Sequence, residues 1–292
     1  MTQYIVDGLL TGILYSLFAV GFSLVYNVSR VFHVAAAGVY VLAACLFHSL
    51  VTYAHFPLLA AGLLAVLAAM LVNWFCDLGV YRPLSRRGAS TNTMLVASIG
   101  LMTILVNLLA ILFQNEAKTI AHPFNHPVSF GSATLTTGQQ MQAVIGISLL
   151  VLILVVIRFT AIGVRFRAVS YDSALYETVG RYPGRVRSFA FLAGGALIAA
   201  SACLNVYEVS FSLNMGFDVL VSALAAMIIG GIGRVEASCL GGMVLGLLEG
   251  CLRMFPFFAS AEQWIGAITL GVLLLFLFLR PQGLAGFKPR EV

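Results

Sequence analysis

The sequence predicts an all-α membrane protein: a polytopic bundle of about eight or nine transmembrane helices forming a single domain over residues 1–292. Of its 292 residues, 61% are hydrophobic and only 9% are charged, whereas soluble domains carry about 25% charged residues. Several apolar stretches reach the roughly 20 residues that a helix needs to cross a bilayer. These long runs lack the two-residue alternation of a membrane β-barrel, so helices are expected.

Nine apolar segments follow one another along the chain. The first lacks the basic start of a cleaved signal peptide, because no Lys or Arg precedes Arg30 and Asp7 lies within the segment. It is therefore taken as the first membrane span, and the seventh segment is short for a span. The segments are 5–28, 33–53, 57–79, 93–114, 139–158, 187–206, 219–232, 237–254 and 262–280.

The basic residues divide the connecting loops into two sets. All of them except Lys118 and Arg253 fall in or beside the turn 29–32, the loops 80–92 and 158–187, the turn 233–236 and the tail after 280. Loops rich in Lys and Arg stay in the cytoplasm, which predicts an external N-terminus and a cytoplasmic C-terminus. The net charge of +5 is thus explained by orientation and gives no indication of nucleic-acid binding. The polar external loop 115–138 either receives a partner or only caps the bundle.

Neither cysteines nor histidines show the spacing of a metal site. The five cysteines are scattered through apolar runs without a Cys-x-x-Cys pair, which is typical of small buried residues. The chain also contains no Gly-x-x-x-x-Gly-Lys-Ser/Thr loop for ATP. No bound cofactor and no catalytic constellation are expected, so the sequence favours a transport subunit over an enzyme.

The cytoplasmic segment 159–186 predicts a short amphipathic helix. Asp172 stands near its expected start, where an acidic side chain suits the positive end of the helix, while Gly180 and Pro183 stand where a helix ends. Leu175 and Val179 are four residues apart and so share one face. The helix either lies on lipid headgroups or docks a cytoplasmic partner.

Glycines cluster in two places. Gly230, Gly231 and Gly233 indicate either a tight turn between two spans or a helix broken inside the membrane. The glycines of the eighth segment repeat every four residues, a spacing that lets helices approach closely. These glycines are Gly242, Gly246 and Gly250, and Gly8 and Gly12 have the same spacing in the first span. They serve either packing within the chain or contact between subunits.

Polar side chains inside spans are costly and mark candidate functional positions. Glu249 lies about one turn before Arg253 and forms either an ion pair or part of a solute pathway. Asn73 and Asp77 lie near the inner end of the third segment, where Arg82 is a candidate partner. His33 and Tyr40, seven residues apart and so expected on one helical face, are candidates to line the pathway together with Ser98 and Asn107.

Six motifs in order resemble the permeases of ABC importers of the branched-chain amino acid class. The resemblance extends over essentially the full chain. The motifs are Asp7-Gly-Leu-Leu-Thr-Gly12 with Tyr15–Tyr26, Tyr81-Arg-Pro-Leu84, Ser98-Ile-Gly100 with Asn107, Gly163 with Arg167-Ala-Val169, Asp172 and Gly180, Gly230-Gly-Ile-Gly233 with Gly241-Gly242, and Arg280-Pro-Gln-Gly-Leu284 with Gly286.

The resemblance implies a larger assembly in a bacterial inner membrane. Such a permease pairs with a second permease subunit, which is a copy or a relative, with two cytoplasmic ATPases that bind ATP and Mg²⁺, and with an extracytoplasmic solute-binding protein. The segment that matches the family's coupling region contains Arg167, Asp172, Leu175, Glu177, Val179 and Gly180. These residues are the candidates for contact with the ATPase.

The chain departs from the family pattern at two positions. The family's usual Asn-Phe-Ala-His-Gly run is His33-Val-Ala-Ala-Ala37 here, and a frequent Lys is Ser222. The resemblance implies ATP-driven import of a small amphipathic solute, with branched-chain amino acids, other amino acids, urea, amides and aromatic acids all left open. The alternative is a secondary transporter or channel, for which Glu249 is the main candidate residue.

Overall fold

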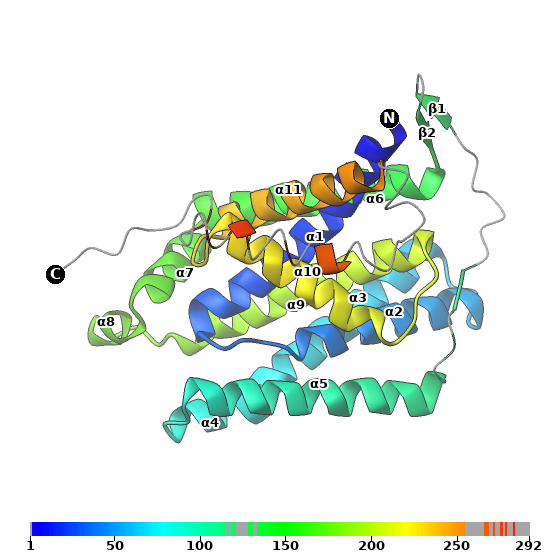
Figure 1. The fold of residues 1–292 in the computed structure, drawn as a ribbon. Coiled ribbons are helices and arrows are strands. Elements are labelled where there is room, and N and C mark those ends of the chain that lie inside the picture. Colours follow the sequence, from blue (N-terminus) through cyan, green and yellow to red (C-terminus); the bar gives the residue numbers. More distant parts are fainter. Residues whose placement is uncertain are drawn as a thin grey trace.

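The computed structural model describes residues 2–114, 116, 118–120, 128–130, 133–254, 266–268, 271, 275–276, 278 and 283. Long helices lie side by side along one direction, and one small hairpin stands at an end of the bundle (Figure 1). The elements are α1 (Thr2–Ser29), α2 (Ala36–Thr52), α3 (Leu58–Cys76), the π-helical turn η1 (Asp77–Tyr81), α4 (Arg82–Arg86), α5 (Thr91–Phe113), β1 (Val128–Phe130), β2 (Ala133–Leu135), α6 (Thr137–Phe159), α7 (Ala161–Tyr171), α8 (Ser173–Thr178), α9 (Gly184–Glu208), α10 (Met215–Gly230) and α11 (Val235–Arg253).

The helices confirm an all-α membrane architecture. Within the described residues, 6 helical stretches are long and apolar enough to cross a membrane, and α2 and α10 are shorter apolar helices. Eight of the nine predicted segments therefore correspond to a described helix, while 262–280 and the Arg280–Leu284 motif fall largely outside the described residues. The antiparallel hairpin β1–β2, in the expected external loop, adds three residues per strand.

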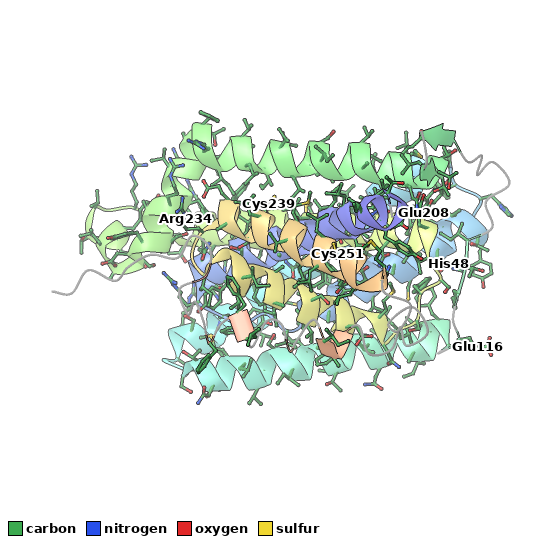
Figure 2. All side chains as sticks on the ribbon, turned by 45° about the horizontal axis from the view of Figure 1, so that its top comes forward. His48, Glu116, Glu208, Arg234, Cys239 and Cys251 are labelled. Atoms are coloured by element: carbon green, nitrogen blue, oxygen red, sulfur yellow. The ribbon has the colours of Figure 1, made fainter. Side chains whose placement is uncertain are left out.

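Helix α1 forms the centre of the bundle. In its most apolar stretch 83% of the residues are buried, against 11% in α5. Helix α1 packs along α11 and α9 and also contacts α10 and α6. Helices α5 and α6 lie on opposite sides of this core (Figures 1 and 2).

Glycines bring α1 and α11 into backbone contact. A Cβ atom on Gly8 would lie 2.9 Å from the Gly246 oxygen, and one on Gly246 would lie under 3.0 Å from the Gly12 nitrogen, closer than real Cβ atoms approach. Gly250 meets Gly8, and Gly242 meets Ser16, in the same way. Of the two roles left open by the four-residue spacing, the structure places these glycines in packing within the chain.

The glycine-rich segment Gly230–Gly233 is a tight turn between α10 and α11. Gly231 and Gly233 have φ angles of 117° and 101°, a region that residues with a Cβ rarely adopt. A Cβ on Gly230 would collide with the Ala237 backbone oxygen. The segment therefore reverses the chain at the end of the bundle and does not break a helix inside it.

Loops from the basic set meet at one end of the bundle, which we call the arginine-rich end. Its contacts join the α1–α2 turn to α7, where Arg30 donates to the Ser170 oxygen, and α4 to the α8–α9 connection and the start of α9, where Arg86 donates to the Tyr182 hydroxyl and Arg82 to the Gly184 oxygen. Arg234 lies at this end too, whereas Glu208, Glu116 and His48 lie at the other (Figure 2). The loops that the charge pattern groups together are thus close in space.

Candidate functional site

Helices α7 and α8 form a small projecting unit at the arginine-rich end (Figure 1). The predicted helix near Asp172 is present as α8, but α7 precedes it, which the sequence pattern did not predict. Asp172 separates the two: its backbone is extended, and its Oδ1 accepts from the N–H groups of Ala174 at 2.9 Å and Leu175 at 3.0 Å. Gly180, with φ of 74°, allows the turn that follows α8.

An apolar groove runs between α7 and α8. Its cavity volume is about 680 Å³, and it is lined mainly by apolar side chains together with Asp172, Arg165 and Arg181. Tyr171, Leu175 and Val179 line it while remaining 78%, 62% and 72% exposed. Such a cluster of large apolar side chains outside the spans is typical of a surface that a partner covers. We call it the docking groove.

The six predicted coupling residues have different positions. Asp172, Leu175 and Val179 line the docking groove, and Gly180 follows it directly. Arg167 instead donates to the Ile157 and Arg158 oxygens at 2.8 and 3.3 Å, so it caps the C-terminal end of α6. Glu177 lines a separate cavity with Arg82 and Arg187.

A buried polar network lies just inside the arginine-rich end. His33 Nε2 lies 2.5 Å from Asn73 Oδ1, and His33 Nδ1 lies 2.9 Å from the Tyr81 hydroxyl. That hydroxyl lies 2.8 Å from Ser98 Oγ, which accepts from the Ala35 N–H. The network therefore joins the α1–α2 turn to α3, η1 and α5, and every one of these side chains is buried.

The network corrects the expected position of His33. His33 lies in the turn before α2, which begins only at Ala36, so it does not share a helical face with Tyr40. Its side chain is fully buried, with both ring nitrogens engaged. Tyr40 lies elsewhere in the core, where its hydroxyl accepts from Asn205 at 2.7 Å.

A buried ion-pair triad adjoins the network. The Asp77 carboxylate is fully buried, with Oδ2 2.6 Å from Arg82 Nε and Oδ1 2.7 Å from Arg187 Nε. Arg82 was expected from its place in the sequence, whereas Arg187 comes from the start of α9. Because α9 follows directly on the α7–α8 unit, the triad joins the region of the docking groove to η1 and α3.

The predicted pathway residues do not form one site. Ser98 and His33 are linked through Tyr81, whereas Glu249 is buried on another side of the bundle, where Tyr15 donates to its carboxylate at 3.1 and 3.3 Å. Ser222 also lies within hydrogen-bonding reach of Tyr15. Sequence reasoning missed Tyr81, Tyr15 and Arg187 as members of these clusters, because their partners come from distant parts of the chain.

Asn107 lies on a face of α5 that no other described helix covers. Thr103 and Asn107 are exposed, and among the described residues their side chains hydrogen-bond only to the α5 backbone, to the oxygens of Ile99 and Thr103. Gly100 lies on the same face, and no atom of the described residues is within 4 Å of the place that a Cβ would occupy. Small and polar residues at the centre of an exposed apolar helix are typical of helix–helix contact in membranes.

The structure offers no metal site among the residues that it describes. In that part of the chain, no group of three or more His, Cys, Asp or Glu side chains is placed so that it could hold an ion. The buried His33 is held by Asn73 and Tyr81 instead. The polar clusters are therefore hydrogen-bond and ion-pair networks.

Comparison with known proteins places these features in context. The family model described as branched-chain amino acid transport system / permease component matches residues 4–278. The chain is 25% identical to the high-affinity branched-chain amino acid transport system permease protein LivH of Escherichia coli K12 and 25% identical to BraD, of the same description, from Pseudomonas aeruginosa. Both alignments cover 97% of this chain and 95% of the relative.

A solved structure has a similar fold. The chain aligns with PsaBC from Streptococcus pneumoniae in complex with Fab, with a TM-score of 0.54 over 94% of this chain and 91% of the other. Sequence identity is 12%, so this likeness concerns the fold alone.

Proposed function

The chain belongs to the family of branched-chain amino acid transport system permease components, and on that premise we propose that it is the membrane-spanning subunit of an ATP-driven importer. In this proposal the arginine-rich end faces the cytoplasm of a bacterial inner membrane. The solute is a branched-chain amino acid, another amino acid or a related amide. ATP and Mg²⁺ bind to separate ATPase chains, and an extracytoplasmic binding protein delivers the solute.

The docking groove is the observation that carries the proposal. It lies at the arginine-rich end, exposes large apolar side chains outside the spans, and is held in shape by the Asp172 cap of α8. An ATPase that fills this groove acts on α9 through the short α8–α9 connection. The Asp77 triad then transmits a movement of α9 to η1 and α3.

The exposed face of α5 is the observation that favours a second permease subunit beside this chain. Gly100, Thr103 and Asn107 occupy its centre, and a carboxamide facing lipid hydrocarbon is costly. A neighbouring helix, from a second copy or a relative, or a solute path between the two subunits removes that cost.

Substitution of Leu175 tests the coupling surface. We expect Leu175→Arg to abolish the stimulation of ATPase activity by solute-loaded binding protein, because it places a charge in the apolar groove, while the chain remains in the membrane. The measurement is ATP hydrolysis by the assembled complex in proteoliposomes. Asn92→Arg, an exposed change at the first turn of α5, is the matched control and is expected to keep normal stimulation. Normal stimulation in Leu175→Arg would refute the role of the groove.

A secondary transporter is the second candidate. The buried Glu249 carboxylate beside Tyr15 is the observation that favours it, since intramembrane acids often bind ions or protons. Uptake driven by a proton gradient without ATP, and lost in Glu249→Gln, would support this function over the first.

A further inference from the structure

A second cavity at the arginine-rich end carries a concentrated positive charge. It lies between α7 and the start of α9 and has a volume of about 720 Å³. Arg165 of α7, Arg181 of the α8–α9 connection and Arg185 of α9 line it, and no carboxylate is among the lining residues. Within the part of the chain that the structure describes, neither salt bridge uses these three arginines, and their side chains are exposed.

The cavity lies at the level where the spans end. Helix α6 ends at Phe159 and α9 begins at Gly184, so Arg165 and Arg185 are each within two turns of the end of a span. In a bilayer, the headgroup phosphates lie beside the ends of the spans. Ile162 and Phe189 line the same cavity, which therefore combines a cationic part with an apolar part.

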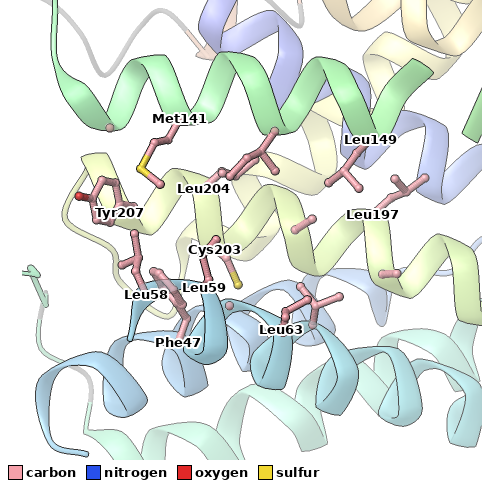
Figure 3. Close-up of a pocket in the computed structure, with 16 residues that line it drawn as sticks. Phe47, Leu58, Leu59, Leu63, Met141, Leu149, Leu197, Cys203, Leu204 and Tyr207 are labelled. Atoms are coloured by element: carbon pink, nitrogen blue, oxygen red, sulfur yellow. The ribbon is translucent and has the colours of Figure 1, made fainter. Parts of the chain in front are cut away.

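The face of α9 that carries this cavity continues into the bilayer. Farther along α9, Ala196, Ala200 and Tyr207 line an apolar cavity of about 270 Å³ between α3 and α6 (Figure 3). The spacings from Arg185 through Phe189 to these residues are close to whole helical turns, so they share one face of α9. This apolar cavity lies toward the opposite end of α9, so the apolar surface that a molecule bound by the arginines contacts is that of Ile162 and Phe189.

We propose that this cavity binds the phosphate of an anionic phospholipid of the cytoplasmic leaflet. Arg165, Arg181 and Arg185 pair with the phosphate, and the glycerol and first methylene groups lie against Ile162 and Phe189. A free inorganic anion would contact only the arginines, whereas a phospholipid contacts the arginines and the apolar side chains. Basic pockets beside spans on the cytoplasmic side bind anionic headgroups for this reason. The inference rests on the part of the proposed function that places the arginine-rich end at the cytoplasmic face of a bilayer, and not on the transported solute.

The site adjoins the docking groove. Arg165, Tyr176 and Arg181 line both cavities. A lipid phosphate that joins α7 to the α8–α9 connection therefore fixes the geometry of the surface that is proposed to meet the ATPase. Lipid composition is then expected to affect coupling as well as binding.

Titration of the purified full-length chain with phosphatidylglycerol, followed by native mass spectrometry, tests the site. We expect saturable binding that phosphatidylcholine does not reproduce, since its choline offsets the phosphate charge. Arg181→Gln/Arg185→Gln is expected to weaken binding by about thirty-fold, from about 1 kcal/mol for each basic residue near an anionic surface. The matched control Arg87→Gln/Arg158→Gln removes the same charge from exposed positions outside the cavity and is expected to bind as the unaltered chain does.

Four results would overturn the proposal. The first is equal binding of phosphatidylglycerol and phosphatidylcholine by the unaltered chain, which needs no variant to interpret. The second is equal weakening in the two double variants, and the third is displacement of phosphatidylglycerol by millimolar inorganic phosphate. The third would make the cavity a site for free anions. The fourth, loss of ATPase association in Arg181→Gln/Arg185→Gln with phosphatidylglycerol binding unchanged, would instead assign these arginines to the partner protein.

Discussion

Asp77→Ala is expected to destabilise the chain by about 3–5 kcal/mol, the cost of leaving one side of a buried ion pair without its partner. The Asp77 carboxylate is fully buried and lies within 2.7 Å of a guanidinium nitrogen on both Arg82 and Arg187. Its loss leaves two partly buried positive charges facing each other between η1, α4 and α9. The thermal unfolding midpoint of the purified chain in detergent should fall sharply.

Two further variants test whether the loss of the ion-pair triad causes the expected loss of stability in Asp77→Ala. Glu177→Ala removes an exposed acid from the same end and is expected to leave the midpoint nearly unchanged. The triple change Asp77→Leu/Arg82→Met/Arg187→Met removes all three charges and should recover most of the lost stability, because apolar replacements of a buried ion pair are often neutral. An Asp77→Ala chain as stable as the original would contradict the role given to the triad.

Gly246→Ala is expected to prevent normal folding. The new Cβ would lie under 3.0 Å from both the nitrogen and the Cα of Gly12, and backbone atoms cannot move aside as a flexible side chain can. Helices α1 and α11 would have to separate along the central contact of the bundle. We expect this to cost more than the about 1–3 kcal/mol that is typical of an added methyl group in a packed core. The measurement is the amount of chain that accumulates in the membrane and its unfolding midpoint.

Gly100→Ala is the matched control for this change. It makes the same substitution in a membrane helix, at a glycine with no atom within 4 Å of the added Cβ. We expect accumulation and unfolding midpoint to stay at the level of the unaltered chain. A Gly246→Ala chain that behaves like Gly100→Ala would show that α1 and α11 do not touch at this point.

Features governed by nearby residues were predictable from the sequence. Apolar runs predicted eight of the helices, the four-residue glycine repeats indicated close packing, and Asp172 and Gly180 marked the limits of α8. The sorting of basic residues into alternate loops also agrees with their meeting at one end. The helix and glycine signals depend on periodicity or on capping chemistry, which acts over one or two turns, and the charge signal depends on the composition of each loop.

Features that depend on distant parts of the chain were not predictable. His33 meets Asn73 and Tyr81 because α3 and η1 pass beside the α1–α2 turn, and the spacing to Tyr40 predicted the wrong helical face. Asp77 was expected near Arg82, but Arg187 is 110 residues away. In the sequence, Arg165, Arg181 and Arg185 are three of the many basic residues of the cytoplasmic set of loops. The packing of α7 against α9 brings them together around one cavity.

The central claim is that this chain works with a separate ATPase, and uptake by the isolated complex tests it most directly. The complex would be isolated from native membranes through a tag on this chain, its co-purifying proteins identified, and radiolabelled leucine uptake measured in proteoliposomes with the copurified partners. We predict an ATPase among those proteins and uptake that requires ATP and does not respond to a proton gradient alone. Isolation without any ATPase, together with uptake that a proton gradient drives in the absence of ATP, would contradict the account.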